Sequence, residues 1–265
     1  MLVPISIRES HLIQNQWIRR KEETKNRQEF SMETKVIRYC FQMPDNSRAV
    51  FKFELNAKNL DLKDSVPKCL PPWTKLESHQ CANCPLDAAA YPYCPLAANI
   101  YNIVQRFDGL NSYDEITLEV VTEQRWIAQR TTAQSGISSM MGLVIAACGC
   151  PHTAFFKPMA WFHLPLASEE ETLFRATSFY MLAQYYSQKD GRAADFEFEG
   201  LAKIYQKMQT VNCAIAQRLR EATASDSSVN AIVILDTFAQ IVPFAIEESL
   251  KELRYLFSPH SAKKI

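Results

Sequence analysis

The sequence predicts an α+β protein, with a small N-terminal antiparallel β-sheet, a hairpin plus a third strand, packed on a C-terminal helical bundle. Two short segments before residue 56 alternate apolar and polar residues, whereas most of the chain after residue 134 repeats apolar residues at helical spacing. The segment between them is rich in proline and cysteine. Periods of two and of 3.6 residues distinguish strands from helices. At 265 residues the chain can bury a sizeable core.

The N-terminal part of the chain predicts a hairpin. Residues 1–31 are polar and have no clear period, so we expect a mobile leader before a single domain at 32–265. The alternating segments 35–43 and 49–55 flank the turn-forming sequence Pro44-Asp45-Asn46-Ser47. Branched and aromatic residues at 116–127 favour a third strand. Residues 32–130 would then hold the sheet and the cysteine-rich segment.

The C-terminal part, 131–257, predicts the helical bundle. A buried helix should end at Gly149, since glycine readily takes the left-handed conformation that terminates helices. Ser168 and Glu171 have the spacing of a capping box at the start of another helix. The helices are expected at 134–147, 168–189, 195–222 and 228–257, after a shorter one that begins near Leu96.

The helix expected at 228–257 should lie at the centre of the bundle. It is apolar almost all round as far as Ile246, and a helix that is apolar on every face is normally buried. The final residues, 258–265, read as a short polar tail.

The cysteines give the strongest functional signal. Five of the eight lie in two tight groups, Cys81, Cys84 and Cys94 in the first and Cys148 and Cys150 in the second. A Cys-x-x-Cys spacing lets two thiolates reach one soft or borderline metal. We therefore predict a metal site.

Four cysteines form the predicted ligand set, namely Cys81, Cys84, Cys94 and Cys150. The fourth ligand is the least certain by sequence, and Cys148, His163 and His79 are its rivals. The proline-rich segment at 64–95 supports a metal, because its prolines prevent regular backbone ladders and something else must order it.

The predicted cofactor is a 4Fe-4S cluster, with Zn2+ as the alternative. Zinc modules usually pair two close Cys couples, whereas iron-sulfur clusters tolerate uneven spacing. Cys84, Cys94 and Cys150 each precede a proline, and proline also follows the last ligand of the ferredoxin motif. Cys40, Cys69 and Cys213 are interpreted as reduced packing residues instead.

Three functions stay open at this point. The first is an iron-sulfur redox or sensing protein, and the second is a non-enzymatic interaction module with a structural zinc site. The third is a thiol enzyme that uses Cys150 or Cys148, with His163 as a candidate base. The sequence does not decide whether the protein is an enzyme, nor which protein partner it has.

Composition limits the partners and the cellular location that we expect for the protein. The 29 basic and 29 acidic residues balance, so no nucleic-acid partner is evident. The longest apolar run, 140–150, is far shorter than the roughly 20 residues that span a bilayer, so no membrane is expected. No secretory signal pattern precedes the domain. We expect a cytoplasmic protein, in which thiols stay reduced.

The motifs His79-Gln-Cys81-x-x-Cys84-Pro-Leu, Cys94-Pro-Leu-Ala, Gly149-Cys150-Pro and Phe162-His-Leu-Pro stand in this order along the chain. In this combination the chain, over about 32–256, resembles a family of uncharacterised bacterial proteins that carry a domain of unknown function. The resemblance implies a bacterial, cytosolic origin and brings neither a substrate nor a mechanism.

Overall fold

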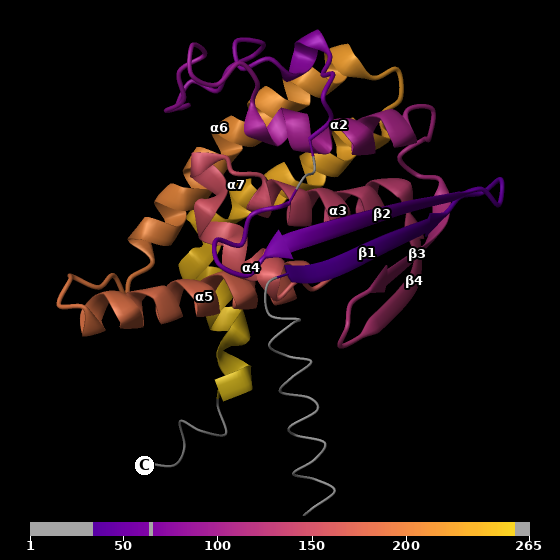
Figure 1. Ribbon diagram of the computed structural model, residues 1–265. Coiled ribbons are helices and arrows are strands. Elements are labelled where there is room, and N and C mark those ends of the chain that lie inside the picture. Colours follow the sequence, from indigo (N-terminus) through magenta and orange to yellow (C-terminus); the bar gives the residue numbers. More distant parts are fainter. Residues whose placement is uncertain (1–33, 64–65, 258–265) are drawn as a thin grey trace, which may run out of the picture.

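The computed structural model describes residues 34–63 and 66–257, in which a β-sheet packs on helices (Figure 1). The α+β prediction is therefore confirmed. The leader predicted at 1–31 and the tail at 258–265 lie outside the described residues.

The sheet has four antiparallel strands in the order β2-β1-β3-β4. The predicted hairpin is present, and its turn is closed by a 2.9 Å bond from the backbone N–H of Met43 to the carbonyl of Ser47. The strands are β1 (Thr34–Gln42), β2 (Arg48–Asn56), β3 (Glu115–Val121) and β4 (Trp126–Thr132).

The single third strand expected at 116–127 is instead a second hairpin. β3 ends at Val121, and the backbone N–H of Thr122 bonds to the carbonyl of Arg125 at 2.9 Å, which turns the chain back. β4 is an edge strand whose residues are mostly exposed or half-buried. It has no apolar alternation, so its sequence gives little strand signal.

One face of the sheet is buried against α3 (Ala133–Ala147). Ile37, Tyr39 and Phe41 of β1 are almost fully buried, while Arg38, between the first two, is exposed. Gly136 allows the close approach, because a Cβ there would lie 2.7 Å from Cδ1 of Ile116 and 3.1 Å from Phe41. The helix and sheet therefore meet so closely that an added Cβ would force the side chain of Ile116 to shift.

The remaining helices follow the predicted order with adjusted ends. The Ser168–Glu171 capping box is present, and Gly149 takes the expected left-handed conformation with φ +83°. Short 3-10 turns occur at Pro72–Thr74 (η1), Pro151–Phe156 (η2) and Arg254–Phe257 (η3). The helices are α2 (Pro95–Phe107), α4 (Lys157–Trp161), α5 (Glu169–Lys189), α6 (Glu199–Ala222) and α7 (Ser227–Leu253).

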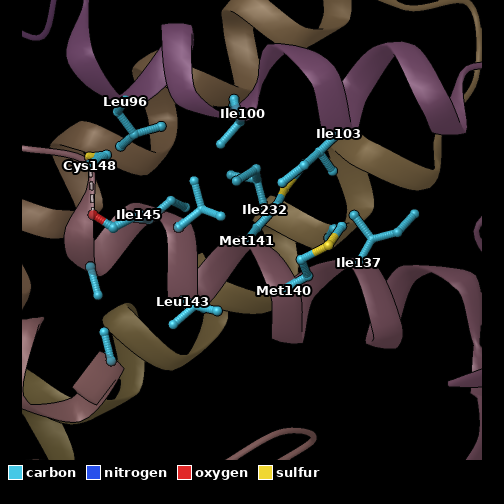
Figure 2. Close-up of a cluster of buried hydrophobic side chains, with 14 of the residues drawn as sticks. Leu96, Ile100, Ile103, Ile137, Met140, Met141, Leu143, Ile145, Cys148 and Ile232 are labelled. Atoms are coloured by element: carbon cyan, nitrogen blue, oxygen red, sulfur yellow. Dashed lines mark hydrogen bonds between the residues drawn. The ribbon is translucent and has the colours of Figure 1, made fainter. Parts of the chain in front are cut away.

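The core joins α2, α3 and α7. Figure 2 shows Ile100 and Ile103 of α2 above Met141 of α3, with Ile232 of α7 among them. α3 thus packs against the sheet as well as against α2 and α7 (Figure 1). Removal of this apolar surface from water is the main force that holds the layers together.

The prediction that α7 is buried on every side is wrong for part of its length. Ala231, Ile232 and Ala239 are buried, but Val233 and Ile241 are 43% and 42% exposed. No single helix among the described residues is long and apolar enough to cross a membrane. Within the described part of the chain, α3 and residues 151–161 together have the length and composition of a membrane span, but the pair is bent by 108°. Most of α3 is buried in the core.

Candidate metal centre

The proline-rich segment forms a loop with a backbone neck. Lys75 and Tyr93 form an antiparallel bridge. The N–H of Leu76 bonds to the carbonyl of Pro92 at 3.0 Å, and the N–H of Cys94 bonds to the carbonyl of Thr74 at 2.9 Å. The expectation that something other than backbone ladders orders this segment is therefore wrong at its base, which backbone pairing closes.

The Cys-x-x-Cys sequence forms a tight turn inside this loop. The backbone N–H of Cys84 donates to the carbonyl of Cys81 at 2.9 Å. Both side chains are half-buried and pack against the hydrophobic core. The turn thus places two thiols on the side of the loop that faces the protein.

Cys94 and Cys150 hold equivalent positions in the backbone. Each is the N-cap residue of a helical segment whose first residue is a proline, Pro95 for α2 and Pro151 for η2. Proline suits this position because it has no N–H to leave unpaired and its φ angle is already helical. The repeated Cys-Pro step therefore aligns each thiol with the start of a helical segment.

The four predicted ligands influence one another electrostatically. Burial raises the pKa of Cys81 to about 12, with further increases from Cys94, Cys150 and Cys84. Burial likewise raises the pKa of Cys150 to about 11, and Cys94 and Cys84 contribute to that increase. The thiols from the loop, from α2 and from the end of α3 are therefore electrostatic neighbours.

Cys148 is held differently from Cys150. Its Sγ donates to the carbonyl of Ile145 at 3.1 Å, and Figure 2 shows it beside Leu96 in the apolar core. Burial, the largest cause, raises its pKa strongly. Cys150 and Cys94 raise the pKa of Cys148 further, so Cys148 also lies near the set. Cys148 is buried and hydrogen-bonded in the core, whereas Cys150 is half-buried, and this favours Cys150 as the fourth member.

Arg218 of α6 is buried beside the thiols. Its side chain is 1% exposed, and it donates to the carbonyls of Trp73, Lys75 and Leu76 at 2.6–3.0 Å. Burial lowers the pKa of the Arg218 guanidinium. The charges of Cys94, Cys81 and Cys84 act in the opposite direction and raise this pKa.

The guanidinium of Arg218 is not neutralised by a carboxylate. Within residues 34–63 and 66–257 it forms no ion pair, and its buried Nε has no hydrogen-bond partner. An unpaired buried charge is costly. The centre therefore has a buried cation that the thiols influence electrostatically, with one donor left unbonded.

His152 joins the two cysteine segments. Its Nε2 lies 2.7 Å from the carbonyl oxygen of Asn83, which stands between Cys81 and Cys84. Asn83 also donates through Nδ2 to the carbonyl of Lys207 on α6 at 3.2 Å. The loop is therefore fixed both to the segment after Cys150 and to α6.

The two histidine rivals have other partners. Nε2 of His79 lies 2.7 Å from Oε1 of Glu221, so this ring is engaged in a surface pair. Nε2 of His163 bonds to the hydroxyl of Tyr39 in β1. Burial lowers the pKa of His163 to about 3, and the charges of Arg175 and Lys35 lower it further.

The side chains do not converge on one point. Among the described residues, no group of three or more His, Cys, Asp and Glu side chains is arranged to hold a metal ion. The expectation that Cys69 and Cys213 are packing residues is wrong, because both are exposed, while Cys40 is half-buried.

The sequence analysis did not identify Arg218 and His152 as residues of the site. Each, however, has a sequence feature that could have indicated it. Arg218 lies next to Leu219 on the face of α6 that carries Val211 and Ile215, where a charge is out of place. His152 directly follows the Cys150-Pro151 step.

A family model described as "Domain of unknown function (DUF6901)" matches residues 37–258. No curated protein and no solved structure matches the sequence.

Proposed function

Because the chain belongs to the family of the domain of unknown function DUF6901, which carries no assigned activity, we propose a function from the geometry of its cysteines. Cys81, Cys84, Cys94 and Cys150 would bind a 4Fe-4S cluster, and the protein would act in electron transfer or sensing. A reducing bacterial cytoplasm would keep these thiols available to the cluster.

The buried charge of Arg218 carries this proposal. A 4Fe-4S cluster bound by four thiolates is an anion, and the three thiols of Cys81, Cys84 and Cys94 already interact with the guanidinium. The free Nε would become a donor to the cluster or to a ligating sulfur. Such an anion would offset a cation that otherwise lies buried without a carboxylate.

The spacing of the thiols along the sequence supports a cluster over a single zinc ion. Zinc modules usually pair two close Cys couples, whereas Cys94 and Cys150 each stand apart from the Cys81-x-x-Cys84 couple. In a cluster each thiolate binds a different iron atom, which requires a wider set of ligands.

The raised pKa values give no support to the thiol-enzyme alternative. A nucleophilic cysteine needs a lowered pKa so that it is a thiolate at neutral pH. Burial raises the pKa of both Cys148 and Cys150. His163, its candidate base, bonds to Tyr39.

When bound, the cluster would supply one-electron redox chemistry. The protein would tune its potential through burial, local charge and hydrogen bonds to sulfur. Arg218 would favour the reduced, more negative state, since the guanidinium stabilises added negative charge.

The test is a determination of iron, acid-labile sulfide and zinc, with a visible absorption spectrum, on protein purified without oxygen. The proposal expects about four iron and four sulfide per chain and a broad visible absorption that bleaches on reduction. About one zinc per chain without sulfide would overturn it in favour of a structural site. A metal-free protein, after attempted reconstitution with iron and sulfide, would overturn it as well.

A further inference from the structure

A cavity of about 460 Å³ lies between α3, α5, α6 and α7, and it contains none of the cysteines. Its volume is within the usual range for sites that take small organic ligands, about 300–1,000 Å³. Most of its wall is apolar. Leu143, Phe156, Met159, Leu235 and Phe238 are among the residues that line it.

Two buried polar side chains of α6 face this cavity without a partner. Tyr205 and Asn212 are 4% and 3% exposed, and both line the cavity. They lie seven residues apart, two helical turns, and so share one face of α6. Within the part of the chain that the structure describes, neither side chain has a hydrogen-bond partner. Their polar atoms are open to the cavity rather than sealed off from solvent, so both are available to bond a ligand that enters it.

Arg175 of α5 adds a positive charge to the cavity wall. One of its terminal nitrogens donates to the carbonyls of Met159 and Phe162 at 2.8 and 3.0 Å. No carboxylate of the described residues forms an ion pair with it. Glu171, one turn earlier, is engaged instead with the backbone N–H of Ser168 at 2.8 Å. The guanidinium therefore keeps donors for another group.

The charge states of the other titratable groups in the cavity wall favour the binding of an anion near Arg175. Burial raises the pKa of Tyr205, so its hydroxyl stays neutral and can donate, and Arg175 is close enough to oppose that increase. His163 is kept neutral by burial. Glu169 also lines the cavity but is exposed, and its charge would repel an anion from its own end.

Gly142 of α3 keeps part of the cavity open. A Cβ at this position would meet only Cδ2 of Leu235, at an ordinary contact distance of 3.7 Å. A longer side chain would extend into the cavity that Gly142 lines.

We propose that this cavity binds a small carboxylic acid with an apolar body, its carboxylate held by Arg175 and Tyr205 and its body lying along the apolar wall. A guanidinium with a neutral O–H donor recognises a carboxylate through charge-assisted hydrogen bonds. The apolar body would gain from burial. The proposed cluster plays no part in this inference.

The test is isothermal titration calorimetry of the full chain with octanoate, and with n-octanol as the neutral ligand of similar size. Octanoate should bind at least about tenfold more tightly than octanol, since only the acid can satisfy Arg175. Tyr205→Phe should weaken octanoate binding about tenfold. Tyr186→Phe is its control, because Tyr186 is 58% exposed and does not line the cavity.

A second pair of variants keeps the test independent of any single hydrogen bond. Gly142→Met should abolish octanoate binding because it fills the cavity, whereas Gly142→Ala should retain it within about twofold. Equal binding of octanol and octanoate would overturn the assignment of an acid. Absence of binding by both ligands, or unchanged octanoate binding in Gly142→Met that remains folded by circular dichroism, would overturn the site.

Discussion

The imidazole of His152 bonds through Nε2 to the carbonyl of Asn83, and this 2.7 Å contact joins segments 69 residues apart in sequence. It holds the Cys81-x-x-Cys84 turn against the segment that begins at Cys150. In the proposed centre the two segments supply ligands to one cluster. The bond therefore positions ligands without being one, as groups around metal sites commonly do.

His152→Phe should lower the iron content of the anaerobic protein by half or more. The phenyl ring keeps the size of the side chain but cannot bond to Asn83, so the two segments would lose about 1 kcal/mol of mutual stabilisation. His79→Gln is the control, because the pair of His79 with Glu221 lies at the surface. Iron lost from His79→Gln to the same extent would contradict the ligand set.

Cys84→Ser should lose most iron and acid-labile sulfide, whereas Cys213→Ser should keep the content of the wild type. Cys84 belongs to the four neighbouring thiols, while Cys213 is exposed on α6. Hydroxyl oxygen is a much poorer ligand than thiolate for iron in clusters. Equal iron in both variants would argue against the proposed centre.

Arg218→Met should lower the free energy of unfolding by about 2–4 kcal/mol, because three neck carbonyls lose their donor. It should also reduce iron content, since the cation that offsets the anionic cluster is gone. Arg220→Met, two residues later and exposed, should change stability by less than about 0.5 kcal/mol. Chemical denaturation of both variants measures the difference. Matching curves for the two would show that the buried guanidinium does not hold the neck.

Gly136→Ala should destabilise the protein by about 1–3 kcal/mol, as overpacking does in a well-packed core. The added Cβ would meet Ile116 at 2.7 Å. Gly142→Ala on the same helix is the control, since its Cβ has ordinary contacts, and it should stabilise α3 by up to about 1 kcal/mol. Thermal unfolding of the two variants should move in opposite directions. If Gly136→Ala is as stable as Gly142→Ala, the close contact of α3 with the sheet is not as described.

The burial of His163 predicts a loss of stability in mild acid. Burial lowers its pKa to about 3, with added effects of Arg175 and Lys35, whereas in the unfolded chain the pKa is about 6.5. Above about pH 6.5 the ring is neutral in both states, so its full contribution is present. As the pH falls from 6.5 toward 3, only the unfolded chain takes up the proton. The free energy of unfolding then falls by up to about 1.4 kcal/mol per pH unit.

Urea denaturation between about pH 4.5 and 7.5 measures this effect in the wild type and in His163→Gln. The variant cannot titrate at this position, so its stability should fall less steeply with acid. Parallel pH profiles for the two proteins would show that His163 is not the group responsible.

Local sequence determined much of the fold. The turn at Pro44–Ser47, the Ser168–Glu171 capping box and the end of α3 at Gly149 depend on residues a few positions apart, and all three were predicted. Hydrogen bonds over such short separations are specified by the residues that make them. The two groups of cysteines could also be recognised from the sequence, because the members of each group lie close together along the chain.

β4 was missed because its stability is not encoded in its own pattern. Its residues are mostly exposed, and its backbone pairs with β3 along the whole strand. An edge strand of this kind needs only a partner strand to pair with, and its own sequence need not show the alternation of apolar residues that predicts a strand.

Tertiary structure alone decided the surroundings of the cysteines and the cavity. Arg218 meets the carbonyl of Leu76 across 142 residues of sequence, and no local pattern indicates such a contact. The choice between Cys148 and Cys150 depends on which thiol α3 turns into the core. Tyr205 and Asn212 are exposed to the cavity because the side chains of the four surrounding helices do not fill the space between them. The sequence determines which chemical groups the site and the cavity contain. Packing between elements far apart in the chain determines which of these groups become neighbours.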